Sequence, residues 1–516
     1  MVDTHKRGRK RRNRAAAEQA GSSFKQLPWQ SIRNPFPPFK FISDDQVEDI
    51  HNASLKVLAE TGINFLLPEA RAILKEAGAD VDESTTRVRF PDGLIETYVA
   101  KAPAEYTMHA RNPDHNMTWG GNVINIGMVG SPPNVSALDI PRRAGTYDDY
   151  CDFLKLAQSL NIINMATGYP VEPTDIPPRT RHLNAYQGMT RITDKLAFGY
   201  ALGDERIRDC LEMTRISHGL NSTDDLKTRP SMFTVVNANS PLQYDTPMLQ
   251  GTIEMANHNQ PIIITPFTLA GAMAPITMIG ALVQQNAEAL AGIAFIQMVN
   301  AGAPCVYGGF TSNVDMKSGS PAFGTPEHAK ATIIGGQLAR RYNLPYRASN
   351  VNASNAPDAQ AAYESQMTIW ACMLGHCNVM LHGAGWIEGG LCASFEKVII
   401  DAEMLQMMAE FLKPLETDPD SLAIEVMAEV GPGGHFFGTQ HTMERYETAF
   451  YSPMLSDWNN FENWTDNGSQ DATVRAHHIY KDLIKNYEPP PLEESIDEEL
   501  DAFIKRRTEE GGVSEL

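Results

Sequence analysis

Residues 305–330, CVYGGFTSNVDMKSGSPAFGTPEHAK, begin with the pattern of a buried β-strand and end with that of an α-helix. The apolar run at 304–309 lacks polar alternation, which is typical of a parallel strand covered on both faces. At the other end, Thr325, Pro326 and Glu327 supply a capping hydroxyl, a proline at the first helical position and a carboxylate near the positive end of the helix dipole. The stretch therefore predicts a strand, a loop and a helix in succession.

Seven other apolar runs have the same character, and helix-like segments with apolar residues at i, i+3 and i+4 lie between them. About eight strand–helix units is the number found in a TIM barrel. We therefore predict an α/β fold, a TIM (β/α)8 barrel, over residues 119–402. A doubly wound open sheet is the alternative, because the pattern indicates the number of strands better than their closure. In chain order the eight runs are VINIGMVG, INMATGYP, KLAFGYAL, MFTVVNANSP, PIIITPFTLAG, PCVYGGFTS, PYRASNVNAS and NVMLHGAGW.

The chain outside the barrel divides into four segments by composition. Residues 1–40 combine the basic cluster KRGRKRRNR with the Pro-rich NPFPPF, and we expect them to form a mobile tail. Residues 41–118 carry helix signals, among them Ser43 as a candidate N-cap, and are expected to form a helical N-terminal segment. Residues 403–485 are expected to form a helical C-terminal cap, and residues 486–516 an acidic tail.

The formal net charge of −20 over 516 residues argues against nucleic acid as a partner, since phosphate binding needs a basic surface. The basic N-terminal cluster is the exception, and we interpret it as a solvated or subunit-crossing tail. Residues 259–287 are uncharged and long enough to span a bilayer. However, Pro266 and Pro275 interrupt them and IIITPF indicates a strand, so we predict no membrane association. Six scattered cysteines and the absence of an apolar signal segment predict a cytoplasmic protein with free thiols.

The candidate site residues follow the apolar runs, because the carboxyl ends of barrel strands form the active face. This set is rich in amides and aromatic rings and poor in lysine and arginine. The sequence has no GxxxxGK[ST], HExxH or GxSxG motif, which argues against nucleotide hydrolysis, zinc-protease and α/β-hydrolase chemistry. The candidates are Asn237, Asn239, Thr265, Phe267, Phe310, Thr311, Ser312, Asn313, Asp315, Asn350, Asn352, His382, Trp386 and Glu388.

A metal site is one possible interpretation of the stretch CMLGHCNVMLH, which places Cys372, His376, Cys377 and His382 close together. Cys372 and His376 could share a helix face, but Cys377 would point elsewhere. We prefer two buried cysteines and a polar histidine at a strand end, and we predict no metal.

Four motifs resemble the trimethylamine methyltransferase (MttB-like) family: DMKSGSPAFGTPE (315–327), NAPDAQAAYE (355–364), GPGGHFFGTQHT (431–442) and DNGSQDATVRAH (466–477). The resemblance extends from about residue 45 to 480. It implies a TIM barrel that transfers a methyl group from a methylated amine to cob(I)alamin. The cobalamin would be carried by a partner corrinoid protein rather than bound permanently by this chain.

Archaeal trimethylamine enzymes of that family carry pyrrolysine at a strand end ahead of a D-x-Q-A segment, which here is Asp358–Ala361. The equivalent position falls near Val351, an ordinary apolar residue. The sequence therefore is similar to the pyrrolysine-free branch that includes glycine betaine:corrinoid methyltransferases. A quaternary amine suits such an enzyme because it leaves as a neutral tertiary amine and needs only alignment of its N–CH3 bond with cobalt.

The resemblance implies roles for several candidates, although it assigns no residue directly to catalysis. We expect an aromatic box for the ammonium group, amides that bond the polar end of the substrate, a counter-charge, and an arginine for a betaine carboxylate. A betaine-binding barrel without turnover and a metal-assisted lyase or hydrolase remain alternatives, and we expect a homo-oligomer. In that order the residues are Phe310, Phe267 and Trp386; Asn350 and Asn352; Glu388; and Arg347, with His382 beside them.

Overall fold

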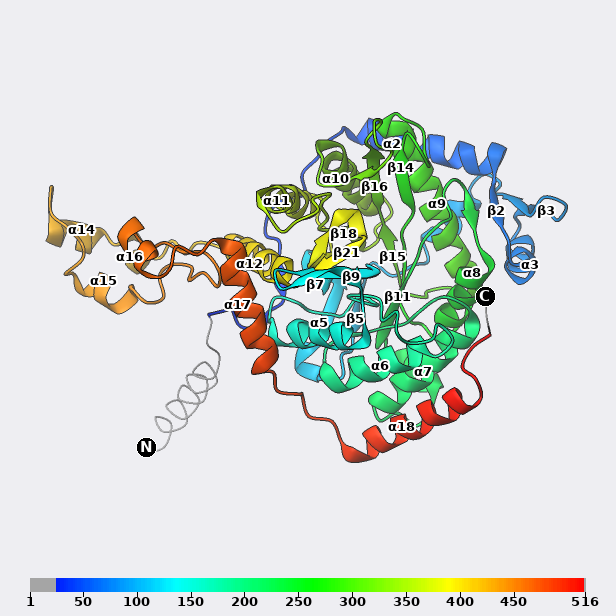
Figure 1. Ribbon diagram of the computed structural model, residues 1–516. Helices are drawn as coiled ribbons and strands as arrows, with labels where there is room; N and C mark the ends of the chain where they lie inside the picture. Colours follow the sequence, from blue (N-terminus) through cyan, green and yellow to red (C-terminus); the bar gives the residue numbers. More distant parts are fainter. Residues whose placement is uncertain (1–24, 515–516) are drawn as a thin grey trace, which may run out of the picture.

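The core of the fold is a closed ring of parallel strands, seen in the computed structural model, which describes residues 25–514 (Figure 1). Neighbouring strands in the sheet follow the order β7-β19-β18-β15-β13-β11-β10. Met165 completes the ring, because it forms parallel bridges to Gly127 on β7 and to Leu196 beside β10. The predicted eight-stranded barrel is thus confirmed, with its second strand reduced to one bridging residue. The strands are β7 (Val123–Met128), β10 (Ala197–Phe198), β11 (Met232–Val236), β13 (Ile262–Ile264), β15 (Cys305–Gly308), β18 (Tyr346–Ser349) and β19 (Val379–Ala384).

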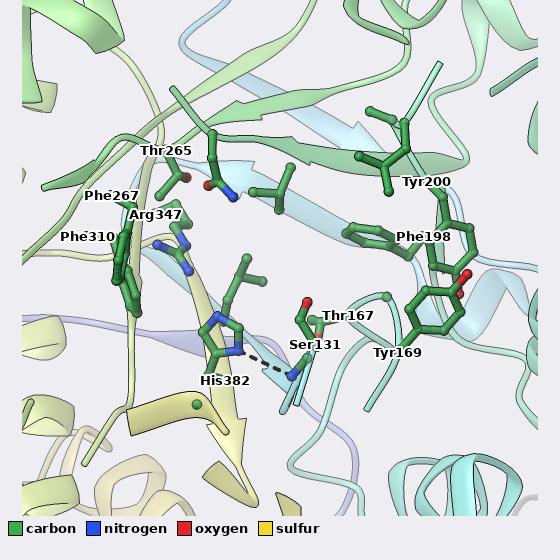
Figure 2. Close-up of a pocket in the computed structure, with 18 of the residues that line it drawn as sticks. Ser131, Thr167, Tyr169, Phe198, Tyr200, Thr265, Phe267, Phe310, Arg347 and His382 are labelled. Carbon is green, nitrogen blue, oxygen red and sulfur yellow. Dashed lines mark hydrogen bonds between the residues drawn. The ribbon is translucent and has the colours of Figure 1, made fainter. Parts of the chain in front are cut away.

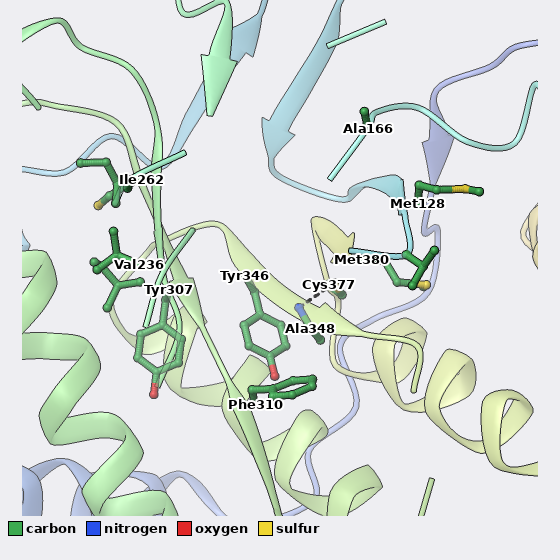
Figure 3. Packing of buried hydrophobic residues seen from close by; sticks show 14 of the residues in the cluster. Met128, Ala166, Val236, Ile262, Tyr307, Phe310, Tyr346, Ala348, Cys377 and Met380 are labelled. Atoms are coloured by element: carbon green, nitrogen blue, oxygen red, sulfur yellow. Dashed lines mark hydrogen bonds between the residues drawn. The ribbon is translucent and has the colours of Figure 1, made fainter. Parts of the chain in front are cut away.

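Eight helices alternate with these strands and surround the barrel (Figure 1). Helix α9 is long and apolar enough to cross a membrane, but it is mostly buried inside the protein and is a core helix. Tyrosines on the strands, labelled in Figure 3, reach the helices: Tyr307 donates to Asn286 on α9 at 2.9 Å, and Tyr346 donates to the Thr332 carbonyl at 2.7 Å. The helices are α5 (Tyr147–Ser159), α6 (Arg181–Ile192), α7 (Asp204–Ser217), α8 (Thr246–Asn257), α9 (Met278–Val299), α10 (Pro326–Arg341), α11 (Ala359–Leu374) and α12 (Phe395–Phe411).

Two small sheets extend the barrel at the carboxyl ends of its strands. In one, β14 (Phe267–Ala270) pairs in parallel with β16 (Phe310–Val314), which also pairs with β17 (Pro321–Ala322). The expected loop after β15 is therefore largely a second strand, held by pairing with residues that follow β13. Thr325 caps α10 as predicted, accepting a hydrogen bond from the His328 amide. The other small sheet contains β8 (Asn134–Ala137), β9 (Ile140–Ala144), β20 (Trp386–Ile387) and β21 (Cys392–Ser394).

The N-terminal segment is a mixed α/β structure, whereas the sequence predicted a mostly helical one. Residues 1–24 of the expected basic tail lie outside the described residues, but β1 (Ile32–Arg33) pairs antiparallel with β7. Trp119 on the β5–β6 hairpin packs edge-on against Phe233 of β11, so this hairpin fills the barrel interior. The elements are α2 (Asp44–Lys56), β2 (Ile63–Phe65), α3 (Pro68–Glu76), β3 (Asp80–Asp82), β4 (Arg87–Arg89), α4 (Leu94–Val99), β5 (Glu105–Met108) and β6 (Met117–Gly120).

The C-terminal region has an arm and two helices that pack on the barrel. The four short helices of the arm, residues 412–470, project away from the barrel in Figure 1 and bury none of their residues, all of which the structure describes. Leu412, Met454 and Leu455 of the arm pack in the main core. α17 (Ala472–Lys485) returns to pack on α12. The expected acidic tail instead contains α18 (Glu494–Glu509), which Arg507 ties to Asp209 of α7 at 2.7 Å. The arm helices are α13 (Pro419–Leu422), α14 (Ile424–Val430), α15 (Gln440–Arg445) and α16 (Phe461–Asp466).

Candidate functional site

A cavity of about 320 Å³ lies at the carboxyl ends of the barrel strands. Its size is in the range of pockets that hold small organic ligands. Aromatic rings and small polar groups form most of its wall (Figure 2). The site is therefore at the end of the barrel where the fold places active sites. The lining side chains used below are Ser131, Thr167, Tyr169, Phe198, Tyr200, Leu202, Asn237, Thr265, Phe267, Phe310, Arg347, His382 and Trp386.

Arg347 on β18 places an unneutralised cation in this wall. The residue is 2% exposed, and its guanidinium makes one weak bond, from Nη1 to the Gly309 carbonyl at 3.3 Å. Nε is buried without a hydrogen-bond partner, and in the described part of the chain no carboxylate forms an ion pair with this side chain. Burial lowers the pKa of Arg347 to about 10, which leaves it charged at neutral pH. A buried cation is costly unless it is paired, so an anionic group brought to this side chain would be stabilised.

His382 enters the cavity from an irregularity in β19. The pairing register of β19 with β7 shifts between Met380 and Ala384, and His382 has a φ of 55°. Its Nδ1 accepts a hydrogen bond of 3.2 Å from the Gly130 amide (Figure 2). Burial, with a smaller contribution from the charge of Arg347, lowers the pKa of His382 well below its ordinary value. The ring is therefore neutral, with its proton on Nε2.

The three aromatic residues expected to form a cation box do come together. The ring centroids of Phe267 and Phe310 are 5.2 Å apart, and those of Phe310 and Trp386 are 6.1 Å apart. Phe323 adds a fourth ring, 5.2 Å from Phe310. However, the guanidinium of Arg347 already lies 5.0 Å from the centre of the Phe310 ring. One ring of this group, Phe310, therefore already contacts a cation of the protein itself.

A second aromatic group lines the cavity and was not predicted from the sequence. Tyr169 stacks on Tyr200 with centroids 4.4 Å apart, and Phe198 meets Tyr200 edge-on at 5.5 Å. The Tyr200 hydroxyl is buried without a hydrogen-bond partner. In Figure 2 this group lies across the cavity from Arg347 and Phe310. A signal was present in the sequence, because GY follows the apolar residues in both INMATGYP and KLAFGYAL.

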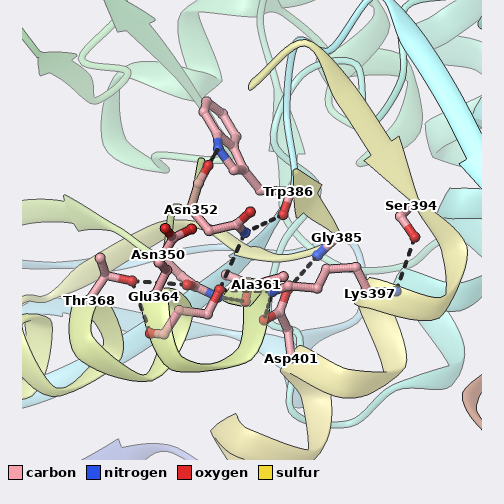
Figure 4. A network of polar contacts seen from close by, with 12 residues as sticks. Asn350, Asn352, Ala361, Glu364, Thr368, Gly385, Trp386, Ser394, Lys397 and Asp401 are labelled. Atoms are coloured by element: carbon pink, nitrogen blue, oxygen red, sulfur yellow. Dashed lines mark hydrogen bonds and ion pairs between the residues drawn. The ribbon is translucent and has the colours of Figure 1, made fainter. Parts of the chain in front are cut away.

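Asn350 and Asn352 do not line the cavity, in contrast to the prediction. They belong to a network of polar contacts (Figure 4). Asn350 donates to the Gly383 carbonyl at 2.8 Å. Asn352 donates to the Trp386 carbonyl at 2.5 Å, and the indole of Trp386 donates to the Asn352 carbonyl at 3.2 Å. Both side chains also form hydrogen bonds with side chains of α11, so they point toward that helix rather than into the cavity. Their observed role is to hold the segment that carries Trp386.

Glu388 and Val351 also lie outside the cavity wall. The Glu388 carboxylate forms an ion pair with Arg142 of β9 at 2.8 Å, so its charge is already compensated. Val351, at the position that resembles the pyrrolysine site, is fully buried after β18.

A buried ion pair supports the turn that precedes Trp386 (Figure 4). Lys397 and Asp401 lie one turn apart on α12, and neither side chain is exposed. Asp401 accepts a 2.9 Å hydrogen bond from the Gly385 amide, and Lys397 donates to Ser365 at 2.8 Å. Burial lowers the pKa of Lys397 and raises that of Asp401, while their attraction opposes both shifts. The pair therefore fixes α12 to the loop on which part of the site is built.

The Cys/His cluster of the sequence is dispersed in the structure. His382 faces the cavity, while the Cys377 sulfur accepts a hydrogen bond from the Ala348 amide at 3.3 Å. Cys372 is buried beside the Ser349 carbonyl. Within residues 25–514, no group of three histidine, cysteine, aspartate or glutamate side chains is arranged to hold a metal ion.

Comparison with known proteins gives one consistent result. Residues 5–512 match the family described as trimethylamine methyltransferase (MTTB). The glycine betaine methyltransferase of Desulfitobacterium hafniense (strain Y51) is 37% identical over 478 residues, covering 92% of this chain and 98% of that protein. The trimethylamine methyltransferase MttB of Desulfitobacterium hafniense (strain DSM 10664 / DCB-2) is 30% identical, covering 92% and 95%.

Solved structures support the fold. The crystal structure of the Methanosarcina barkeri monomethylamine methyltransferase (MtmB) aligns with a TM-score of 0.51, covering 92% of this chain and 90% of that one. At 11% sequence identity, this similarity concerns the barrel architecture alone. Since the family match spans nearly the whole sequence, the chain is a methyltransferase and belongs to the trimethylamine methyltransferase (MTTB) family.

Proposed function

We propose that this methyltransferase removes a methyl group from a quaternary ammonium carboxylate, a betaine, and transfers it to the Co(I) of a partner corrinoid protein. The observation that carries the proposal is Arg347, a buried and unpaired cation in an aromatic cavity. A betaine has the two charges that such a site would recognise. Its carboxylate suits the guanidinium, and its ammonium suits the aromatic rings.

The carboxylate would restore the balance of charge at Arg347. Nε has no partner and Nη1 has only a long contact, so the guanidinium retains donors for a charge-assisted, two-point bond. Thr265 adds a hydroxyl that is buried without a partner in the same wall. Trimethylamine and choline lack a carboxylate and would leave Arg347 unpaired. This difference favours betaines over both compounds.

The reaction needs no proton from the protein. The electron pair of Co(I) forms a bond to the methyl carbon, and the pair of the N–CH3 bond stays on nitrogen. A quaternary ammonium therefore leaves as a neutral tertiary amine. His382 is neutral and its Nδ1 is held by Gly130, so it can donate from Nε2 to the carboxylate without changing its charge. The work of the site is to align the N–CH3 bond with cobalt.

The corrinoid is best accommodated outside the cavity. A volume of about 320 Å³ suits an amino-acid-sized molecule but not a corrin macrocycle. The cofactor would therefore reach the substrate from the open end of the barrel, carried by its own protein. A resident cobalamin is not part of this proposal.

The test is methyl transfer by the purified full-length chain, first to free cob(I)alamin and then to a competent corrinoid protein. Loss of the cob(I)alamin spectrum would be followed with glycine betaine, carnitine, choline and trimethylamine. We expect turnover with at least one betaine, much less with choline and none with trimethylamine. Equal turnover of trimethylamine would overturn the proposal. Betaine binding without turnover beside a competent corrinoid protein would indicate a binding protein instead.

A further inference from the structure

We infer that Tyr169, Phe198 and Tyr200 form the surface that binds the substrate's ammonium group, in place of the rings around Phe310. This inference rests on the proposed betaine substrate and assigns an orientation to it. The carboxylate would lie at Arg347, and the N-methyl groups would lie against the three rings across the cavity (Figure 2).

The charge of Arg347 disfavours a second cation beside Phe310. Arg347 lies over the Phe310 ring at 5.0 Å, so that ring already attracts one cation. A quaternary ammonium placed between Phe310, Phe267 and Trp386 would stand close to the guanidinium, where like charges repel in a poorly solvated site. Of the described residues that line the cavity, Arg347 is the only one with a permanent positive charge. The favourable place for a second cation is therefore away from it.

The wall formed by Tyr169, Phe198 and Tyr200 has a shape that suits an ammonium group. Tyr169 and Tyr200 are stacked at an interplanar angle of 21°, and Phe198 stands at 66° to Tyr200. All three side chains line the cavity. Rings at two inclinations can enclose several methyl groups of one ammonium ion, and their electron-rich faces attract its charge. The charges of Arg181 and Arg206 act on Tyr169, but neither residue lines the cavity, and the Arg206 guanidinium donates to the Leu202 carbonyl.

The inferred orientation also leaves the methyl groups accessible to an acceptor. Leu202 follows Tyr200 along the chain and lines the same cavity, yet it is 42% exposed. Tyr169 is half-buried, whereas Arg347 is buried. The wall is thus exposed at Leu202, beside the second aromatic group, while the guanidinium itself is shielded from solvent. A betaine held in the inferred orientation presents its N-methyl groups toward solvent, where a methyl acceptor on another protein can reach them.

The experiment compares two ligands of the same shape on the full-length protein, without corrinoid. Glycine betaine and 3,3-dimethylbutanoate share a carboxylate and three methyl groups, but a neutral carbon replaces nitrogen in the second. The ratio of their Kd values, measured by isothermal titration calorimetry, isolates the contribution of the positive charge. We expect the wild-type protein to prefer glycine betaine.

Variants then locate that preference. Tyr200→Leu and Phe198→Leu should each reduce the preference severalfold, and the double variant should reduce it by about tenfold or more. Tyr200→Phe keeps the aromatic face and should retain it, which also separates the loss of a ring from misfolding. Phe267→Leu, on the Arg347 side, is the matched control, since it should change both Kd values by the same factor.

Two results would overturn the inference. If Phe267→Leu removes the preference while Tyr200→Leu and Phe198→Leu keep it, the ammonium lies beside Phe310. If the wild-type protein binds neither of these ligands nor carnitine, the proposed betaine substrate is itself wrong, and the orientation is rejected with it. The first result leaves the proposed function intact, so the two failures are distinguishable.

Discussion

The Nδ1 atom of His382 accepts a hydrogen bond from the amide of Gly130, and this contact fixes the ring as a neutral donor at Nε2. The bond joins the ends of β7 and β19, which are adjacent strands of the barrel. Because a protonated imidazole would lose this acceptor, the hydrogen bond and the burial both favour the neutral ring. The site thus contains a titratable side chain that does not titrate near neutrality.

The rate of methyl transfer should therefore show no pH dependence from the ionisation of His382 near its ordinary pKa. We expect single-turnover rates at saturating betaine to stay constant from about pH 6 to about pH 8, since the pKa of His382 lies well below its model-compound value of about 6.5. The measurement is a stopped-flow pH profile. An inflection near pH 6.5 that disappears in His382→Gln would contradict this assignment.

Arg347→Met should stabilise the protein while removing its activity. The substitution replaces an unpaired buried cation with an apolar side chain of similar length, so the free energy of unfolding should rise by about 1 kcal/mol or more. Without the guanidinium that pairs with the substrate carboxylate, kcat/KM for glycine betaine should fall by at least about a hundredfold. Urea unfolding and steady-state kinetics test both parts. Arg347→Lys is the control, because it keeps the charge without the two-point geometry; an unchanged KM in Arg347→Met would rule out the carboxylate role.

Asn352→Ala should loosen Trp386 without touching the cavity directly. It removes the 2.5 Å bond to the Trp386 carbonyl and leaves that buried oxygen without this donor, at a cost of about 1–3 kcal/mol of stability. We also expect a lower kcat and altered tryptophan fluorescence. Asn459→Ala on the exposed arm also removes a hydrogen bond donated by a side-chain amide, here to Asp457, and should have almost no effect on stability. Equal stability losses in the two variants would argue against the positioning role.

Lys397 and Asp401 should show strong coupling in a double-mutant cycle. Either Lys397→Met or Asp401→Leu leaves an uncompensated charge in a fully buried position, and each should cost about 3–5 kcal/mol. The double variant should be much less destabilised than the sum of the two, because no charge remains. Chemical denaturation of the four proteins gives the coupling energy. Additive effects would mean that the two charges do not stabilise each other.

Stability should fall as pH drops below about 6.5. Burial lowers the pKa of His328 to about 4 and that of His218 to about 3. Between these values and about pH 6.5, the two histidines are protonated in the unfolded chain but neutral in the folded protein. Each such histidine contributes a slope of about 1.4 kcal/mol per pH unit, present below the unfolded pKa of about 6.5 and ending at its folded pKa. Urea unfolding at pH 7, 6 and 5 measures it. His328→Gln should have a shallower slope, and an identical slope would exclude His328 as a source.

The sequence was sufficient to predict the barrel for a physical reason. Parallel strands covered on both faces need apolar residues at every position, so even short strands such as β13 (Ile262–Ile264) are visible as continuous runs. The run containing Met165 was also recognised, although only one of its residues pairs with its neighbours. The short N-terminal strands were missed, because three-residue strands such as β3 and β4 carry too little periodicity to be distinguished from helix ends.

The site was predictable only in part, because a strand end does not specify which way a side chain points. Arg347, Phe310 and Trp386 were expected near the ligand and do line the cavity. Asn350 and Asn352 follow the same strand but face the helices, and a choice between the two directions needs the register of β18. The sequence also could not show that the charge of Glu388 is compensated, since its ion-pair partner Arg142 is far away along the chain.

The arm at residues 412–470 begins and ends on helices that are joined to each other without it. The Phe395 ring on α12 lies 5.0 Å from the Tyr480 ring on α17, and Glu396 on α12 bonds His477 on α17 at 2.8 Å. Loop-closure entropy grows only slowly with length, so the barrel tolerates a long or a short connection at this point. The part of the arm that contains α13–α15 is therefore a graft site for engineering, because the contact between α12 and α17 does not depend on it.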